Sequence, residues 1–329
     1  MQAEVAGILR SMALVAEVLF FGDNTEFRNP HREGETILGA AATFAVDIRL
    51  GDHASLVAGA FGTRRYGSDR AFDLVRPVLT LRLTNDRSTL LIGTLDVPVA
   101  GDPPGPDRTG PHGLLAPIQR ETLAFERPYE AGFQWKFAGA SVTQDAWINW
   151  QRLNTPAHRE RFDAGAAGEV RVMSWLAIPY QFHIVHEGGQ LFASGPVADS
   201  TAAATGAVFR ARLGRQMLTV ETVGIIARFV PDRDVAERYV EGSGGFLRAA
   251  VVRDGWRGHV VIWGSEDFVK VEGDPNYQAS RYAEAGLTRT FRPAPGTIVE
   301  TSARLHRIER DIEYSFRVLG IVRLRRSFQ

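Results

Sequence analysis

The side chains that could carry chemistry in this sequence are charged residues that alternate with apolar ones. Arginine dominates the cations, because Lys136 and Lys270 are the only lysines among 38 basic residues. Arginine stays charged and binds carboxylate, phosphate or sulfate oxygens in a forked geometry, so a surface lined by it attracts anions. Basic and acidic residues balance at 38 each, so no net charge recruits nucleic acid.

Motifs for catalysis or metal binding are absent from the sequence. It has no cysteine, no Gly-x-Ser-x-Gly, no phosphate-binding glycine loop and no His-Glu-x-x-His. His183 and His186 are three residues apart on an expected strand, so they point to opposite faces and cannot share a metal ion. Residues 242–245 fall in an expected loop, where a flexible turn is the better interpretation. We therefore predict that the chain is not an enzyme and has no catalytic residue, metal or cofactor. A phospholipase or protease is the alternative, but no residue specifies one.

Alternation of apolar and polar residues indicates that β-strands position these charges. Every even position from Leu38 to Leu50 is apolar, and the longest such segment ends the chain. A helix cannot use this pattern, because side chains two apart lie on opposite sides of its axis. The expected strands number about sixteen: 10–21, 35–50, 54–62, 73–84, 88–95, 129–138, 142–152, 164–173, 175–186, 202–213, 216–229, 245–253, 256–264, 279–291, 297–307 and 311–328.

The connections between these strands alternate between short and long. Residues 51–53 and 214–215 are short connections, whereas residues 96–128 form the longest. An up-and-down barrel in a bacterial outer membrane has short turns at one rim and long loops at the other. A β-sandwich or propeller does not require this alternation of short and long connections. No uninterrupted apolar run approaches the roughly 18 residues of a membrane helix. The alternative is a soluble all-β protein whose apolar faces form its core.

The C-terminal segment carries a family resemblance. The alternating run from Tyr314 through Phe316 to Phe328, followed by Gln329, resembles the last strand of bacterial outer-membrane barrels, which their assembly machinery recognises. The resemblance, which is to general porins, implies one all-β domain over 1–329: a transmembrane antiparallel barrel of about 16 strands with short periplasmic turns and long extracellular loops. Aromatic residues near strand ends would then form membrane girdles. The predicted girdle residues are Tyr129, Trp150, Trp256, Phe291, Tyr314 and Phe328.

The polar face of these strands would line the barrel interior. The predicted pore-lining residues are Arg49, Arg76, Arg82, Arg171, Arg210, Arg212, Arg304, Arg317, Arg323, Glu300 and Glu313. Opposed charges inside a pore create a field that filters solutes by charge. The alternative is that they form cross-strand ion pairs that stiffen the wall.

The long connection 96–128 follows the fifth expected strand. In general porins the loop at this place folds into the lumen and narrows the channel, so the resemblance implies the same role here. The candidate constriction residues are Asp96, Asp102, Asp107, Arg108, His112, Glu121 and Glu126. The alternative is an exposed surface loop.

These observations favour an outer-membrane channel for passive diffusion of small polar or anionic solutes. The alternatives are a channel for an acidic polysaccharide or another specific substrate, and a structural or adhesive barrel with a blocked lumen. The expected partners are membrane lipid, lipopolysaccharide, the transported solutes and the barrel-assembly machinery, but not nucleic acid; the chain could form a homo-oligomer. Met1–Glu4 do not begin a signal peptide, which leaves either a cytosolic protein or an exported chain from which that peptide has been removed. The barrel pattern favours the second, so we expect the chain in the bacterial outer membrane.

Overall fold

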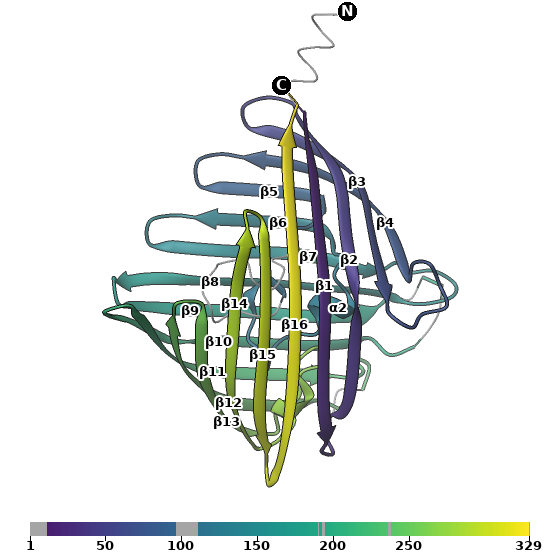
Figure 1. Cartoon of the computed structure of the whole chain (residues 1–329). Helices are drawn as coiled ribbons and strands as arrows, with labels where there is room; N and C mark the ends of the chain where they lie inside the picture. The colour runs from purple at the N-terminus through teal and green to yellow at the C-terminus, as the bar shows by residue number, and fades with distance from the viewer. Residues whose placement is uncertain (1–11, 97–110, 190, 193–194, 236–237, 329) are drawn as a thin grey trace, which may run out of the picture.

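The fold is a closed barrel of sixteen antiparallel strands within the part of the chain that the computed structural model describes, residues 12–96, 111–189, 191–192, 195–235 and 238–328. Each strand pairs with its neighbours in sequence, and β16 closes the barrel against β1 (Figure 1). This arrangement confirms the predicted all-β, up-and-down fold. Among the described residues, no helix is long and apolar enough to span a membrane.

The strands and short helices of the described residues have the following bounds. The strands are β1 (Met12–Arg28), β2 (Glu33–Arg49), β3 (Ala54–Arg65), β4 (Leu74–Thr84), β5 (Ser88–Thr94), β6 (Ala131–Ala138), β7 (Val142–Arg152), β8 (Glu160–Met173), β9 (Leu176–Gly188), β10 (Ala198–Leu213), β11 (Gln216–Val230), β12 (Val240–Arg253), β13 (Trp256–Glu266), β14 (Arg281–Ala294), β15 (Thr297–Ile308) and β16 (Asp311–Ser327). The helices are η1 (Pro111–Gly113), α2 (Leu123–Glu126) and η2 (Pro275–Gln278).

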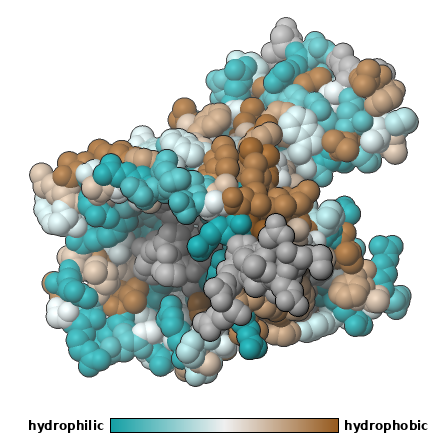
Figure 2. Space-filling view, turned by 90° about the horizontal axis from the view of Figure 1, so that it is seen from above, coloured by the Kyte–Doolittle hydropathy of each residue, from teal (hydrophilic) through white to brown (hydrophobic). Residues whose placement is uncertain are grey.

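Alternating side chains give the barrel wall an outer and an inner face. Phe44, Phe133, Phe209 and Phe316 are exposed on the outer face, as the alternation in the sequence predicts. Their sequence neighbours Ala45, Gln134, Val208 and Ser315 point inward and are buried. The view from above shows brown, hydrophobic residues at the surface beside teal, hydrophilic ones (Figure 2).

Several strands extend further than the sequence pattern indicates, and β1 and β12 do so by the largest margin. β1 continues to Arg28 rather than ending near residue 21, because inward Asp23 and Thr25 find partners on β16 and β2. β12 begins at Val240, so the interpretation of residues 242–245 as a flexible turn is wrong. Glycine is needed there for close packing, since a Cβ on Gly244 would lie 2.0 Å from the Trp263 ring.

Two connections enter the barrel and occupy part of its interior. We call residues 111–130 the first inserted segment and residues 267–280 the second. Leu114, Leu115 and Ile118 share one buried cluster with inward residues of β7, β10, β11, β12, β13, β14 and β15, which is possible only from inside the barrel. Phe125 of α2 stacks on Phe21 of β1, with ring centroids 5.3 Å apart. Two apolar clusters thus fill part of the interior, whereas a sixteen-stranded barrel without inserted segments leaves an aqueous channel.

Candidate functional site

Four polar side chains on β14, β15 and β16 form a continuous hydrogen-bonded chain inside the barrel. Ser315 Oγ lies 2.8 Å from His306 Nε2. His306 Nδ1 lies 2.8 Å from the Tyr282 hydroxyl, which donates to Glu284 Oε2 at 2.8 Å. All four side chains are buried. Strand pairing alone brings these residues together, because they lie on three adjacent strands in the inward register.

The hydrogen-bond pattern of this chain fits one tautomer of His306. The Tyr282 hydroxyl gives its single proton to Glu284, so it accepts from His306 Nδ1, which therefore carries the proton. His306 Nε2 is then free to accept the hydroxyl proton of Ser315. This arrangement can activate a serine nucleophile: the serine is hydrogen-bonded to an imidazole, and a third group holds the other imidazole nitrogen.

Glu284 is itself held in place by β13. His259 Nε2 donates to Glu284 Oε1 at 2.6 Å, and Arg257 Nη1 donates to His259 Nδ1 at 3.1 Å. Gly286 makes room for this imidazole, because a Cβ at Gly286 would lie 2.2 Å from His259 Cε1. Both oxygens of Glu284 therefore have partners, which fixes the carboxylate behind Tyr282.

Arginine side chains line the same small cavity as Ser315. Arg304 pairs with Ser315 across the β15–β16 ladder, and its Nη2 lies 2.9 Å from Glu121 of the first inserted segment. Arg317 binds the same Glu121 oxygen at 2.6 Å and Asp23 at 2.5 Å. A cavity of about 50 Å³ lies among these residues, which is room for a few water molecules.

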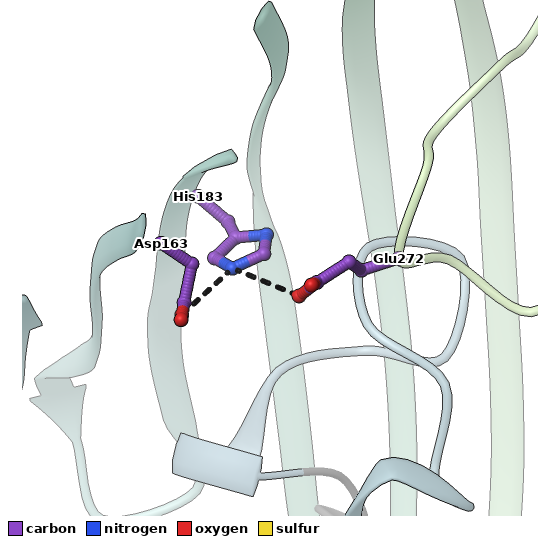
Figure 3. A group of neighbouring side chains, drawn as sticks. All are labelled: Asp163, His183 and Glu272. Carbon is purple, nitrogen blue, oxygen red and sulfur yellow. Dashed lines mark hydrogen bonds and ion pairs between the residues drawn. The ribbon is translucent and has the colours of Figure 1, made fainter. Parts of the chain in front are cut away.

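A second buried polar cluster consists of Asp163 on β8, His183 on β9 and Glu272 on the second inserted segment (Figure 3). His183 Nε2 lies 3.3 Å from Asp163 Oδ2 and 3.9 Å from Glu272 Oε2. The three residues are at most 3% exposed. Their donor atoms lie within 4.8 Å of one another, as the ligands of one metal ion would.

Further donors hold the two carboxylates of this cluster. Asp163 Oδ1 accepts from Asn149 and Gln151, each at 2.8 Å. Glu272 Oε1 accepts from Arg127 at 2.6 Å and from Arg161 at 3.0 Å. These neighbouring cations, Arg127 foremost, lower the pKa of Glu272 despite its burial, so it is ionised at neutral pH.

Lys270 and His112 are two further buried cations on the inserted segments. Lys270 donates to the Ser200 carbonyl at 3.1 Å, and burial lowers the pKa of its amine to about 8. His112 lies between Glu130 at 2.8 Å and Asp145 at 2.9 Å. These carboxylates outweigh burial and raise the pKa of His112 to about 9, so its imidazole is charged at neutral pH.

Predicted pore-lining residues lie in the inward register of their strands. Arg49, Arg76, Arg171 and Arg212 are exposed there, whereas Arg82 and Glu300 are half-buried. The other five contact polar partners: Arg210 with Glu169, Arg304 with Glu121, Arg317 with Asp23, Arg323 with Glu17, and Glu313 with the Arg28 amide. Arg82 also pairs with Asp47, at 3.7 Å. Ion pairs thus account for five of the arginines, and a role in permeation stays a prediction.

Four of the candidate constriction residues are described and have polar partners. Asp96 pairs with Lys136 at 2.9 Å, Glu126 with Arg120 at 2.5 Å, Glu121 with Arg304 and Arg317, and His112 with two carboxylates. Asp102, Asp107 and Arg108 lie outside the described residues. The first inserted segment lies within the barrel, but a constricting role stays a prediction.

Five of the six predicted girdle residues are exposed: Trp150, Trp256, Phe291, Tyr314 and Phe328. Tyr129 packs against inward-facing Phe61 and donates to the Pro77 carbonyl at 2.9 Å. The position of all six relative to a bilayer stays a prediction.

Sequence reasoning missed both polar clusters. We compared His183 only with His186, and the two do lie on opposite faces: His183 points inward, while His186 pairs with outward Asp199. The sequence did contain a pattern that could have revealed the cluster around Ser315. Glu284, His306 and Ser315 all fall in the inward register of three consecutive expected strands, so pairing those strands would have brought them together.

Comparison with known proteins gives a family and a fold. A model of the family described as "Lipid A 3'-O-deacylase-type" matches residues 10–325. No curated protein sequence matches the chain. Because the family is described by a deacylation activity, our prediction that the chain is not an enzyme is wrong.

Solved structures of outer-membrane proteins share this barrel. A loop L8 deletion mutant of OmpT from Vibrio cholerae has a TM-score of 0.57 at 8% identity, over 95% of this chain and 99% of that one. OccK8 (OprE) from Pseudomonas aeruginosa has a TM-score of 0.55 at 11% identity, over 97% of this chain and 99% of that one. These matches confirm the resemblance to outer-membrane barrels in fold.

Proposed function

Since the chain belongs to the lipid A 3'-O-deacylase-type family, we propose that it is a bacterial outer-membrane esterase that removes an acyl chain from lipid A or a related acylated glycolipid. The observation that carries this proposal is the 2.8 Å hydrogen bond between Ser315 and His306, whose other nitrogen is held by Tyr282. This arrangement supplies a nucleophile and its base for acyl transfer.

The proposed reaction begins with Ser315. As His306 Nε2 takes its proton, Ser315 Oγ attacks the ester carbonyl carbon, and Tyr282 with Glu284 holds the imidazolium in place. The Arg304 guanidinium, across the ladder from Ser315, would stabilise the negative oxygen that forms. His306 then protonates the departing sugar oxygen and leaves an acyl-serine. Water, activated by His306, hydrolyses this ester and releases the fatty acid.

The interior also offers separate surroundings for the two ends of an amphipathic substrate. Glu121 and Thr122 border the arginine-lined cavity, which suits a polar head. Ala124, one turn away, borders a second cavity of about 220 Å³ with an apolar wall that includes Leu19 and Phe61. An acyl chain would be sheltered from water there.

The proposal is tested by converting Ser315 to alanine. We expect S315A to lose fatty-acid release from purified lipid A, measured by mass spectrometry, by about 1,000-fold or more. S302A is the matched control, because Ser302 is a buried inward serine of β15. It takes no part in the hydrogen-bonded chain of Ser315, His306, Tyr282 and Glu284, which we call the Ser315 relay. Full activity in S315A would overturn the proposal.

A passive diffusion channel for small polar or anionic solutes is the second candidate function, with an acidic polysaccharide as an alternative cargo. It is favoured by Arg49, Arg171 and Arg212, which are inward-facing yet exposed. In planar bilayers, replacing Arg49, Arg171 and Arg212 together with serine should shift the reversal potential toward cations. R289S, which changes an outward-facing arginine, should not. No conductance by the wild-type chain would exclude this role and leave the esterase.

A homo-oligomer in either role is a further proposal, for which the OmpT trimer offers a precedent in the same fold.

A further inference from the structure

The cluster of Asp163, His183 and Glu272 has the spacing of metal ligands (Figure 3). Bonds of about 2.05 Å in a tetrahedral zinc site place two ligand atoms about 3.3 Å apart. His183 Nε2 and Asp163 Oδ2 are 3.3 Å apart, and His183 Nε2 and Glu272 Oε2 are 3.9 Å apart. A small movement of Glu272, which lies on a connection rather than a strand, would complete the geometry.

Each carboxylate also has one oxygen saturated by other donors and the other oxygen turned toward His183. Asn149 and Gln151 hold Asp163 Oδ1, while Arg127 and Arg161 hold Glu272 Oε1. Outer donors of this kind orient carboxylates that bind metals. The other oxygen of Asp163, Oδ2, has two contacts among the described residues. It accepts a hydrogen bond from the Trp147 indole at 3.0 Å and lies beside His183 Nε2.

Glu272 Oε2 is an independent sign that a ligand is missing from this network. The oxygen is buried and has no hydrogen-bond partner in the described part of the chain. An unsatisfied buried carboxylate oxygen is destabilising by about 1–3 kcal/mol or more, so native proteins rarely leave one. A cation placed between His183 Nε2, Asp163 Oδ2 and Glu272 Oε2 would satisfy it.

The chemistry of the ligands selects the kind of metal ion. One imidazole nitrogen with two carboxylate oxygens suits zinc and similar transition metals, whereas calcium and magnesium prefer sites made entirely of oxygen. Arg127 and Arg161 both bind Glu272 through Oε1 and leave Oε2 available to a metal ion. The positive charge of Arg127 and Arg161 also disfavours ions such as calcium and magnesium, whose binding is mainly electrostatic.

We propose that Asp163, His183 and Glu272 bind one divalent transition-metal ion of the zinc class, with water as a fourth ligand. The ion would join the second inserted segment to β8 and β9 and so fix that segment inside the barrel. The site shares no residue with the Ser315 relay, and the proposal does not depend on the esterase activity.

The test is metal binding by the full chain, folded in detergent and stripped with a chelator. We expect the wild-type protein to bind one equivalent of Zn²⁺ by calorimetry and elemental analysis, and one equivalent of Co²⁺ with the visible absorption of a tetrahedral site. H183Q and E272Q should lose this binding. H158A is the matched control, because His158 lies in an exposed connection and should leave the stoichiometry unchanged.

Two outcomes would overturn the proposal. One is failure of the stripped wild-type protein to bind Zn²⁺ or Co²⁺, which needs no variant and is therefore independent of folding defects. The other is undiminished binding by folded H183Q and E272Q. Protease cleavage of the second inserted segment should also be slower with Zn²⁺ present in the wild-type protein but not in H183Q.

Discussion

Ser315 and His306 are diagonal neighbours across the β15–β16 ladder, since Ser315 pairs with Arg304 and His306 with Glu313. Diagonal positions on one face of a sheet are about 7–8 Å apart, a gap that an imidazole can span. The offset brings Ser315 Oγ to 2.8 Å from His306 Nε2. Strand register, rather than a loop, therefore sets the distance between the proposed nucleophile and its base, which keeps the pair preorganised.

Removal of the Tyr282 hydroxyl should impair the proposed reaction without unfolding the barrel. Y282F leaves the ring in place but breaks the link from His306 Nδ1 to Glu284, so the imidazole loses the group that fixes its tautomer. We expect kcat for fatty-acid release to fall by about 100-fold while KM changes little.

Y277F is the matched control for this prediction. Tyr277 is equally buried and packs against Tyr282, with ring centroids 4.7 Å apart, yet it is not part of the relay. Equal losses in Y282F and Y277F would mean that ring packing, rather than the hydroxyl, supports activity.

Loss of the positive charge on His112 should make the first inserted segment less stable at alkaline pH. Its pKa is raised from 6.5 to about 9, so the stabilisation is complete below pH 6.5 and is lost as pH rises through about 9. The difference corresponds to at most about 3 kcal/mol. Hydrogen exchange of residues 111–128 should therefore become faster, relative to the intrinsic exchange rate, between pH 7 and pH 10.

H112Q separates this effect from general alkaline instability. The variant lacks the titrating group, so its protection should change less over the same pH range. A wild-type pH dependence identical to that of H112Q would show that the pair with Glu130 and Asp145 does not stabilise the segment.

The barrel was predictable from sequence because strand alternation is local. The outward Phe44 and Phe316 and the inward Asp47 and Arg317 follow from counting positions by two. The extension of β1 past Gly22 was not predictable in this way, because Asp23 and Asn24 favour turns. Arg317, which is distant in sequence, pairs with Asp23 and makes it acceptable inside the barrel.

The two polar clusters depend on contacts that alternation does not encode. Asp163 and His183 lie on adjacent strands, but Glu272 reaches them from a connection about 90 residues later in the chain. No periodic pattern places such a connection. The relay of Ser315, His306, Tyr282 and Glu284 required only strand register, yet it matches no short linear motif, since its members come from three strands.

Adjacent residues of β2 offer a direct test of which face meets lipid. Phe44 is exposed on the outer face, while Thr43 borders the interior cavity of about 220 Å³. An arginine on a lipid-facing strand position is destabilising by about 2–4 kcal/mol at mid-bilayer, because the charge leaves water for hydrocarbon. F44R should lower the free energy of unfolding in lipid vesicles by that amount. T43R, whose guanidinium can reach interior water, should change it by less than about 1 kcal/mol. Equal destabilisation by the two variants would contradict the assignment of the outer face to lipid.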